Sequence, residues 1–378
     1  MQKRIFFILI FLSLLSCKEI SDSPSIIKEQ DQSSMIDHAT GFEIEKMKGG
    51  KIITIKNAWP GSEEEFKYAV IKRGTTLTNP EQFDAIVETP VESIVVTSTT
   101  HIPSLDLLGV SNYLVGFPNL DYISSKTIRE RIKKGSVTEL GKNEDINTEV
   151  LIDLNPNLVI GFAVEGANKT LNTIKHTGIP VLYNGDWTEN SPLGKAEWIK
   201  FFGVIFGMEN KADSIFSEIE DQYFKAKEIA KKATTTPTVI SGAMFKDIWY
   251  MPYGNSWAAQ FINDANGDYL WSESKGSGSL ALNLENVLDK GKNADLWIGP
   301  GYFSEKEQLR DAHPIYSQFE AFKNDHIYSF TNKKGETGGV LYYELAPNRP
   351  DIVLKDMIKI LHPELLTDHQ FYFFGKLK

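Results

Sequence analysis

Short apolar runs alternate with amphipathic stretches along the chain from residue 91 onward. The runs are rich in β-branched residues and end in glycine, proline or polar residues, which is typical of buried strands. They fall at residues 93–97, 113–115, 158–160, 181–183, 239–240, 296–298 and 327–330. Because helical stretches separate successive runs, the pattern predicts an α/β fold with mostly parallel central sheets.

One helical pattern, at residues 209–232, is much longer than the others. Its apolar residues recur at steps of three and four along one side. They are Ala212, Ile215, Phe216, Ile219, Tyr223, Ala226, Ile229 and Ala230. At about 1.5 Å per residue the helix is roughly 36 Å long, the diameter of a small domain. We predict that it forms a rigid bridge between two α/β lobes; a packing helix within one lobe is the alternative.

Two segments on either side of this helix share a pattern. Residues 147–161 and 283–299 each begin with Asn-x-Glu, continue into a short helical stretch and end in an apolar run stopped by glycine. An Asn caps a helix, and a Glu in the first turn lies at the positive end of its dipole. The repeat predicts two related α/β halves with a site between them. A chance match is the alternative, since helix–loop–strand units are common.

The N-terminus carries an export signal. Lys3 and Arg4 precede an apolar run at residues 5–15, which is too short to span a bilayer and fits a signal peptide. Residues 14–17 then resemble the lipobox of bacterial lipoproteins, which makes Cys17 the predicted lipidation site. Cys17 is the only cysteine, so no disulfide can form within the chain. An ordinary signal peptide with an incidental cysteine is the alternative.

These signals divide the chain into five parts. A lipoprotein signal peptide (1–16) and a flexible polar tether (17–40) precede the folded region. The folded region comprises an N-terminal α/β lobe (41–208), the bridging helix (209–233) and a C-terminal α/β lobe (234–378). Within the first lobe, residues 41–90 are a β-rich addition, where alternating runs around Gly49 and Gly50 predict a hairpin.

Composition excludes several classes of protein. The chain has 378 residues, of which 41% are hydrophobic and 24% charged. It is longer than a domain with a single hydrophobic core usually is, so we expect two lobes. The net charge of −10 and the lack of a basic stripe argue against nucleic acid as a partner. The sequence contains no nucleophile elbow, P-loop, dinucleotide fingerprint or His-Glu-x-x-His motif, so we do not expect an enzyme.

Several motifs occur together in a characteristic order. They are Leu-Gly at 140–141, the Asn-x-Glu to Leu-Val-Ile-Gly segment at 147–161, Thr-Gly-Ile-Pro-Val at 177–181, and a closing helix from Arg-Pro-Asp at 349–351 to 364. Over roughly residues 91–365 the chain resembles the helical-backbone substrate-binding lipoproteins of ABC importers, of the periplasmic binding protein type 2-like family. These are receptors for cobalamin, ferric siderophores and haem. Residues 41–90 depart from the family pattern.

The resemblance implies a function and a setting. We expect a monomer that captures a metal chelate between its lobes and delivers it to ABC permease subunits, without intrinsic cofactor or catalysis. A lipid anchor would hold it in the cell envelope, in the periplasm or at the surface. Members of the family dock through one acidic residue on each lobe. Glu165 and Glu305, which follow equivalent strands of the two repeats, are the candidates.

Open α/β sheets bind ligands beyond the carboxyl ends of their strands. The predicted loops at these ends are rich in aromatic residues, which offer rigid contact area to a large flat ligand. The candidate contacts are Thr99, His101, Phe117, Phe162, Trp187, Trp249, Tyr250, Tyr253, Trp257 and Tyr302. Three of them lie within residues 249–253, where we find no helical or strand period.

The scarcity of cations helps to choose a ligand. The chain has six Arg, and the predicted loops add little beyond Lys246, Lys333 and Lys334. A ferric catecholate carries strong negative charge and calls for Arg or Lys, so we favour cobalamin or a hydroxamate chelate. Haem is an alternative, with His101 or Tyr250 as iron ligand. A zinc or manganese receptor is another, although the seven His form no paired cluster, and we predict no metal site.

Overall fold

The structure is a computed structural model that describes residues 36–143, 145–164, 166 and 168–378. The predicted signal peptide, most of the tether and Cys17 lie outside the described residues, as does Glu165. Two hydrophobic cores organise the rest. One draws its buried residues from Ile36 to Ile219 and the other from Leu193 to Leu377.

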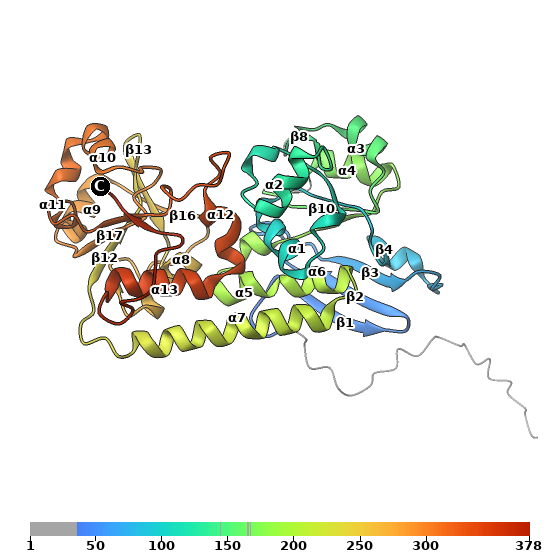
Figure 1. The fold of residues 1–378 in the computed structure, drawn as a ribbon, viewed down its shortest axis with the longest axis horizontal. Helices are drawn as coiled ribbons and strands as arrows, with labels where there is room; N and C mark the ends of the chain where they lie inside the picture. The colour runs from blue at the N-terminus through green and yellow to red at the C-terminus, as the bar shows by residue number, and fades with distance from the viewer. Residues whose placement is uncertain (1–35, 144, 165, 167) are drawn as a thin grey trace, which may run out of the picture. The chain divides into compact units, whose positions relative to one another are not determined.

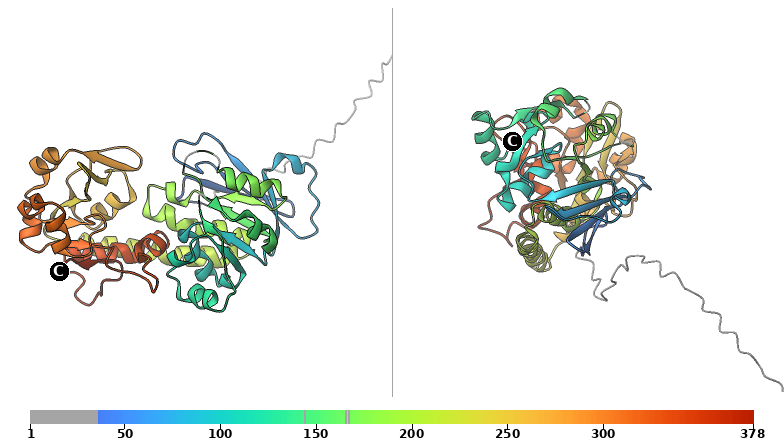
Figure 2. Two further views of the ribbon diagram at one scale, coloured as in Figure 1. Left: turned by 90° about the horizontal axis from the view of Figure 1, so that it is seen from above. Right: turned by 90° about the vertical axis from the view of Figure 1, so that its right-hand side faces the viewer.

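The first sheet is formed by the N-terminal residues of the folded region. Its strands, in spatial order, are β1 (Phe42–Met47), β2 (Gly50–Ile55), β3 (Phe66–Lys72) and β4 (Ala85–Thr89). The β1–β2 pair is the predicted hairpin, and β3 pairs with β4 in parallel. The sheet packs on the lobe beside it (Figure 2). The Tyr68 hydroxyl accepts a hydrogen bond from the backbone N–H of Tyr183 at 3.0 Å, and the ring centroids of Phe42 and Trp198 lie 4.4 Å apart.

The second sheet has the order β11-β10-β5-β6-β7, with all neighbouring strands parallel. Its strands are β5 (Ile94–Val96), β6 (Leu114–Phe117), β7 (Thr138–Glu139), β10 (Leu158–Gly161) and β11 (Val181–Tyr183). The connections contain α1 (Ile102–Leu108), α2 (Lys126–Lys133), the small pair β8 (Gly141–Lys142) and β9 (Asp145–Ile146), α3 (Thr148–Leu154) and α4 (Lys169–His176).

The third sheet has the order β15-β12-β17-β18-β19 and is parallel except at its last pair. Its strands are β12 (Thr238–Ser241), β15 (Asp268–Tyr269), β17 (Leu296–Ile298), β18 (Ile327–Ser329) and β19 (Gly375–Lys376). A three-stranded antiparallel sheet, β13 (Ala243–Phe245), β14 (Ile248–Pro252) and β16 (Ser279–Leu282), follows β12. The helices of this lobe are α8 (Trp257–Asp264), α9 (Leu284–Gly291), α10 (Lys306–Ala312), α11 (Glu320–Lys323), α12 (Leu341–Leu345) and α13 (Pro350–Leu361).

Three helices link the lobes: α5 (Pro192–Glu197), α6 (Ile199–Ile205) and α7 (Glu209–Ala230). The apolar side of α7 passes from one core to the other, because Phe216 and Ile219 belong to the first core and Tyr223 and Ala226 to the second. Figure 1 shows α7 running along both lobes. The predicted fold class is confirmed: two α/β lobes with mostly parallel sheets, joined by one long helix.

The sequence repeat corresponds to equivalent elements in the two lobes. The side chain of Asn147 caps α3 by accepting from the N–H of Val150, and Asn283 caps α9 by accepting from Asn286. Each helix leads to an inner strand of a parallel sheet, β10 in one lobe and β17 in the other. The shared pattern therefore encodes a shared helix–strand unit.

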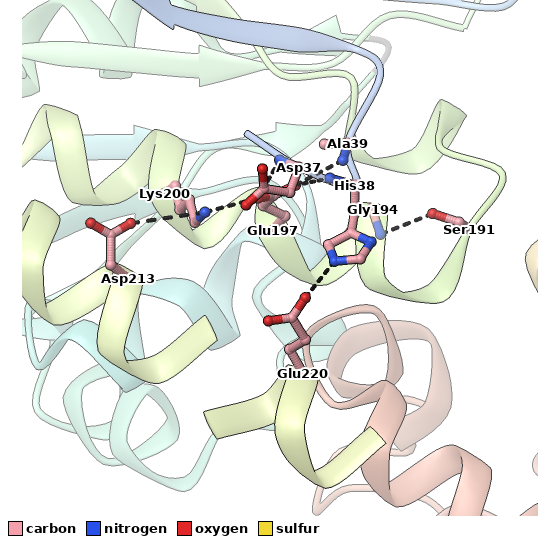
Figure 3. Close-up of polar contacts among 9 residues, drawn as sticks. All are labelled: Asp37, His38, Ala39, Ser191, Gly194, Glu197, Lys200, Asp213 and Glu220. Carbon is pink, nitrogen blue, oxygen red and sulfur yellow. Dashed lines mark hydrogen bonds and ion pairs between the residues drawn. The ribbon is translucent and has the colours of Figure 1, made fainter. Parts of the chain in front are cut away.

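Buried carboxylates on α5 and the turn before it hold the start of the described chain. Glu197 accepts hydrogen bonds from the backbone N–H groups of Asp37, His38 and Ala39 at 2.7–2.9 Å (Figure 3). Glu189 does the same for Thr40 and Gly41. We call residues 37–41 and these two carboxylates the N-terminal clamp.

Candidate functional site

The carboxyl ends of the two parallel sheets face each other. Thr337, which follows β18, donates its hydroxyl to the backbone O of Asp121, which follows β6, at 2.7 Å. Asn348 bonds to the Ser104 hydroxyl and the Thr100 backbone O, after β5, at 2.9 and 3.0 Å. This is the edge at which open α/β sheets bind ligands.

Two tyrosines form an exposed pair on the second lobe at this edge. Tyr302 follows β17 and is 84% exposed, while Tyr343 of α12 is 47% exposed. Partial burial of the Tyr343 hydroxyl, together with the neighbouring Tyr302 hydroxyl, raises its pKa to about 12. Tyr343 therefore stays a neutral phenol near neutral pH. Sequence reasoning found Tyr302, which comes shortly after a predicted strand, but missed Tyr343, which lies on a short helix further along the chain from the strand before it.

The β13–β14 hairpin adds exposed aromatic surface next to β12. Phe245 is 67% exposed and Tyr250 is 38% exposed. Trp249, between them, is fully buried: its indole N–H donates to the Ser241 backbone O at 2.9 Å, and its ring lies 5.4 Å from Trp297. A strand period does place residues 248–251 alternately outside and inside, contrary to our interpretation of this segment. Trp249 is therefore a core residue, and we no longer include it among the ligand contacts.

The other predicted contacts fall into two groups. Phe117 is buried in the first core at the end of β6, so it too is removed from the contacts. The half-buried residues are Thr99, Phe162, Trp187, Tyr253 and Trp257. Trp257 lies where the lobes meet, since the Lys195 ammonium of α5 is 5.2 Å from the centroid of its ring. On the first lobe, Tyr122 after β6 is an exposed aromatic residue that we did not predict.

His101 is enclosed rather than presented to a ligand. Its side chain is completely buried and its ring centroid lies 5.7 Å from that of Phe202. Burial lowers its pKa, and nearby Asp186 and Asn184 offset only part of the effect. Within the described residues, neither ring nitrogen has a hydrogen bond of good geometry. Because the ring is enclosed, His101 cannot reach a haem iron in this conformation.

Lys195 is a buried cation beside this histidine. Its ammonium donates to the backbone O atoms of Asp186 and Trp187 at 3.0 and 2.9 Å. Burial lowers its pKa to about 8, although the charges of Asp186 and Glu189 act against the shift. On the first lobe, His101, Asp186 and Lys195 are therefore buried polar residues, whereas the second lobe has exposed aromatic rings.

The geometry of the described residues identifies neither a metal centre nor the residues that dock on a permease. Among the residues that the structure describes, no three His, Cys, Asp or Glu side chains are grouped to hold a metal ion. Glu305 is exposed and caps α10 in a capping box with Gln308. Its role in docking stays a prediction, as does that of Glu165.

Comparison with known proteins identifies the family of the chain. It belongs to the periplasmic binding protein family, whose sequence profile matches residues 94–333. An uncharacterized lipoprotein of Methanocaldococcus jannaschii is 26% identical over 300 residues, covering 77% of this chain and 70% of that protein. The predicted family resemblance is therefore confirmed, and the β1–β4 sheet precedes the matched region.

Solved structures show the same fold. A periplasmic haem-binding protein of Vibrio cholerae aligns with a TM-score of 0.55 at 16% identity, covering 70% of this chain and 99% of that one. A protein of an ABC-type Fe³⁺-hydroxamate transport system from Saccharomonospora viridis aligns with a TM-score of 0.56 at 15% identity, covering 82% and 98%. At such identities the likeness establishes the fold alone.

Proposed function

We propose that this chain is the substrate-binding protein of an ABC importer, and that it captures a bulky metal chelate between its lobes for delivery to the permease. The observation that carries the proposal is the set of exposed rings at the facing sheet edges, foremost Tyr302 and Tyr343. Large flat ligands gain contact area on such rings with little loss of side-chain entropy.

The charge near these rings favours a near-neutral chelate, either a ferric hydroxamate or cobalamin. Arg is absent from the segments that follow β12 and β17 up to the next α-helix, and from the segment between β18 and α12. Lys246, in the β13–β14 turn, lies over the Phe245 ring at 5.6 Å. A ferric catecholate would need more positive charge than this. The S. viridis relative, which comes from a hydroxamate system, supports the hydroxamate.

Haem is the second candidate, supported by the exposed phenols and by the haem-binding relative from V. cholerae. Tyrosine is a known haem ligand, and Tyr302, Tyr343 and Tyr250 are all accessible. His101, by contrast, is enclosed and is no longer a candidate ligand.

The proposed setting is the cell envelope, with Cys17 lipidated and the protein acting as a monomer beside its permease. The M. jannaschii relative is itself called a lipoprotein. In the described part of the chain, no helix is both long and apolar enough to cross a membrane. Mass spectrometry of membrane-extracted protein should show a diacylglyceryl adduct on Cys17 that is lost in Cys17→Ala.

A thermal-shift screen tests the ligand. Ferrichrome, cyanocobalamin, haemin and a ferric catecholate should be compared, because a tight ligand raises Tm by mass action. We expect ferrichrome or cyanocobalamin to raise Tm by several degrees, and Tyr302→Ala or Tyr343→Ala to weaken binding about tenfold. Tyr372→Ala is the matched control, since Tyr372 is similarly exposed, at 46%, but follows α13. If no chelate shifts Tm, the proposal fails.

A further inference from the structure

A segment of the second lobe crosses to the first on the side of the proposed site. We call residues 332–344, between β18 and the end of α12, the strap. Besides the Thr337–Asp121 hydrogen bond, Glu336 pairs with Lys133 of α2 at 2.6 Å. Gly335 and Gly339 allow the close approach, because a Cβ at either position would come within 2.7 Å of Ser124 or Tyr122. The strap is therefore fitted to the first lobe.

Glu344, at the end of the strap, makes a buried contact between the lobes. Its side chain is 1% exposed, and its carboxylate accepts hydrogen bonds from the backbone N–H groups of Ser124 and, at 3.0 Å, of Ser125. Ser125 in turn caps α2 through the N–H of Ile128. Glu344 thus ties α12 to the start of a first-lobe helix.

The residue next to Glu344 is Tyr343, which lies on the exposed side of the same short helix, near Tyr302. The Phe330 ring packs against this helix. Its centroid lies 4.4 Å from that of Tyr342, in a stacked arrangement, and 5.5 Å from that of Tyr343, edge to face. One turn of helix therefore carries both a ring of the proposed site and the buried lobe-to-lobe contact.

We propose that Glu344 is a positioning residue of the ligand site, which holds α12 against the first lobe so that Tyr343 faces a bound chelate, and that the contact tightens when Glu344 takes up a proton. This inference rests on the proposed function for its ligand. The contact itself can be measured without one.

The protonation argument follows from the surroundings of Glu344. Burial raises its pKa to about 7; the N–H groups of Ser124 and Ser125 lower it, and the charge of Asp106 raises it again. His101, on the 3-10 turn that packs against α12, has its pKa lowered by burial and contributes little positive charge. When the lobes separate, Glu344 meets water and returns to its ordinary value near 4.5. Closure is therefore accompanied by proton uptake between these two values, so the contact weakens as pH rises from about 4.5 to about 7 and changes little above that.

The experiment measures two quantities on the full chain in detergent at pH 5.5 and pH 8.5. One is the affinity for ferrichrome, and the other is the amide-exchange protection of Ser124 and Ser125 without ligand. In the wild type both should fall with rising pH, the affinity by up to about thirtyfold, because pH 5.5 lies about 1.5 units below the pKa of about 7 and each unit corresponds to a factor of ten. Glu344→Gln keeps the shape of the side chain but does not titrate, so both pH dependences should flatten to within about twofold.

Glu336→Gln is the matched control on the same strap. Lys133 lowers the pKa of Glu336, so this group stays charged across the range and the variant should keep the wild-type pH dependence. Equal slopes in the wild type and Glu344→Gln, or equal flattening in both variants, would overturn the proposal. Absence of ferrichrome binding at either pH would count against the hydroxamate function alone, because the exchange of the Ser124 and Ser125 amides still decides the role of Glu344.

Discussion

Two buried regions of the molecule are stabilised by different chemistry. Behind the β13–β14 hairpin, Trp249 packs with Trp297, Tyr316 and Phe319 in an aromatic stack with ring distances of 5.2–5.6 Å. At the N-terminal clamp, by contrast, Glu197 is completely buried and is satisfied by three backbone N–H groups and by an ion pair with Lys200 at 2.8 Å (Figure 3). The comparison shows that buried aromatic rings can serve packing alone, and that a buried charged group can serve to fix a segment of the chain. Aromatic content by itself therefore does not mark a ligand contact.

The largest expected effect comes from the aromatic stack. Trp249→Ala should lower the free energy of unfolding by about 4 kcal/mol, because it leaves a large cavity in a packed core. Tyr250→Ala removes a neighbouring exposed ring and should cost less than about 1 kcal/mol. Urea unfolding of both variants measures the difference. Equal losses would mean that the hairpin does not separate a core side from a ligand side.

A slightly smaller effect is expected at the clamp. Glu197→Ala should cost about 3 kcal/mol, because it leaves three backbone N–H groups and the Lys200 ammonium without their carboxylate. Asp213→Ala is the control, since Asp213 is 44% exposed and 4.0 Å from the same ammonium. Chemical unfolding at pH 7 measures both. Losses of similar size would show that the clamp depends on surface charge and not on the buried carboxylate.

The clamp also predicts a pH dependence. Burial raises the pKa of Glu197, but Lys200 and the three N–H groups lower it more, so the net shift is downward. A lowered carboxylate pKa contributes stability above the ordinary value, and this stability is lost as pH falls through the lowered value. Between pH 5 and pH 3 the wild type should therefore lose more stability than Glu197→Ala. Parallel curves from acid titration of the unfolding midpoint would contradict this.

The smallest effect tests the equivalence of the two repeat units. Asn147→Ala and Asn283→Ala each remove one helix cap and should each cost about 1 kcal/mol. Asn286→Ala, within α9, should be nearly neutral because its side chain does not cap the helix. Thermal unfolding with calorimetry compares the three. A cost at only one cap would show that the two units do not contribute alike to their lobes.

Periodic features of the fold could be predicted from the sequence, and irregular ones could not. The long helix and the inner strands stand out because many residues repeat one period. Strands β7, β15 and β19 have only two residues each, too few to show any period. At residues 248–251 every residue is apolar or aromatic, so the alternation between buried Trp249 and exposed Tyr250 leaves no mark in the pattern.

The site was harder to predict than the fold. Tyr302 was found because it follows a recognisable strand. Glu344 was missed because its contacts lie 219 and 220 positions away in the chain, at Ser125 and Ser124. His101 shows the reverse, since a histidine in a loop gives no hint that its ring will be covered by Phe202.

The N-terminal clamp decides where a mechanical load on the start of the described chain would act. Because Glu197 fixes the backbone at residues 37–39, ahead of β1, a pull from the N-terminal side would act on α5 and would not separate the strands of the β1–β2 hairpin. A buried carboxylate thus shields the first sheet from force applied along the chain.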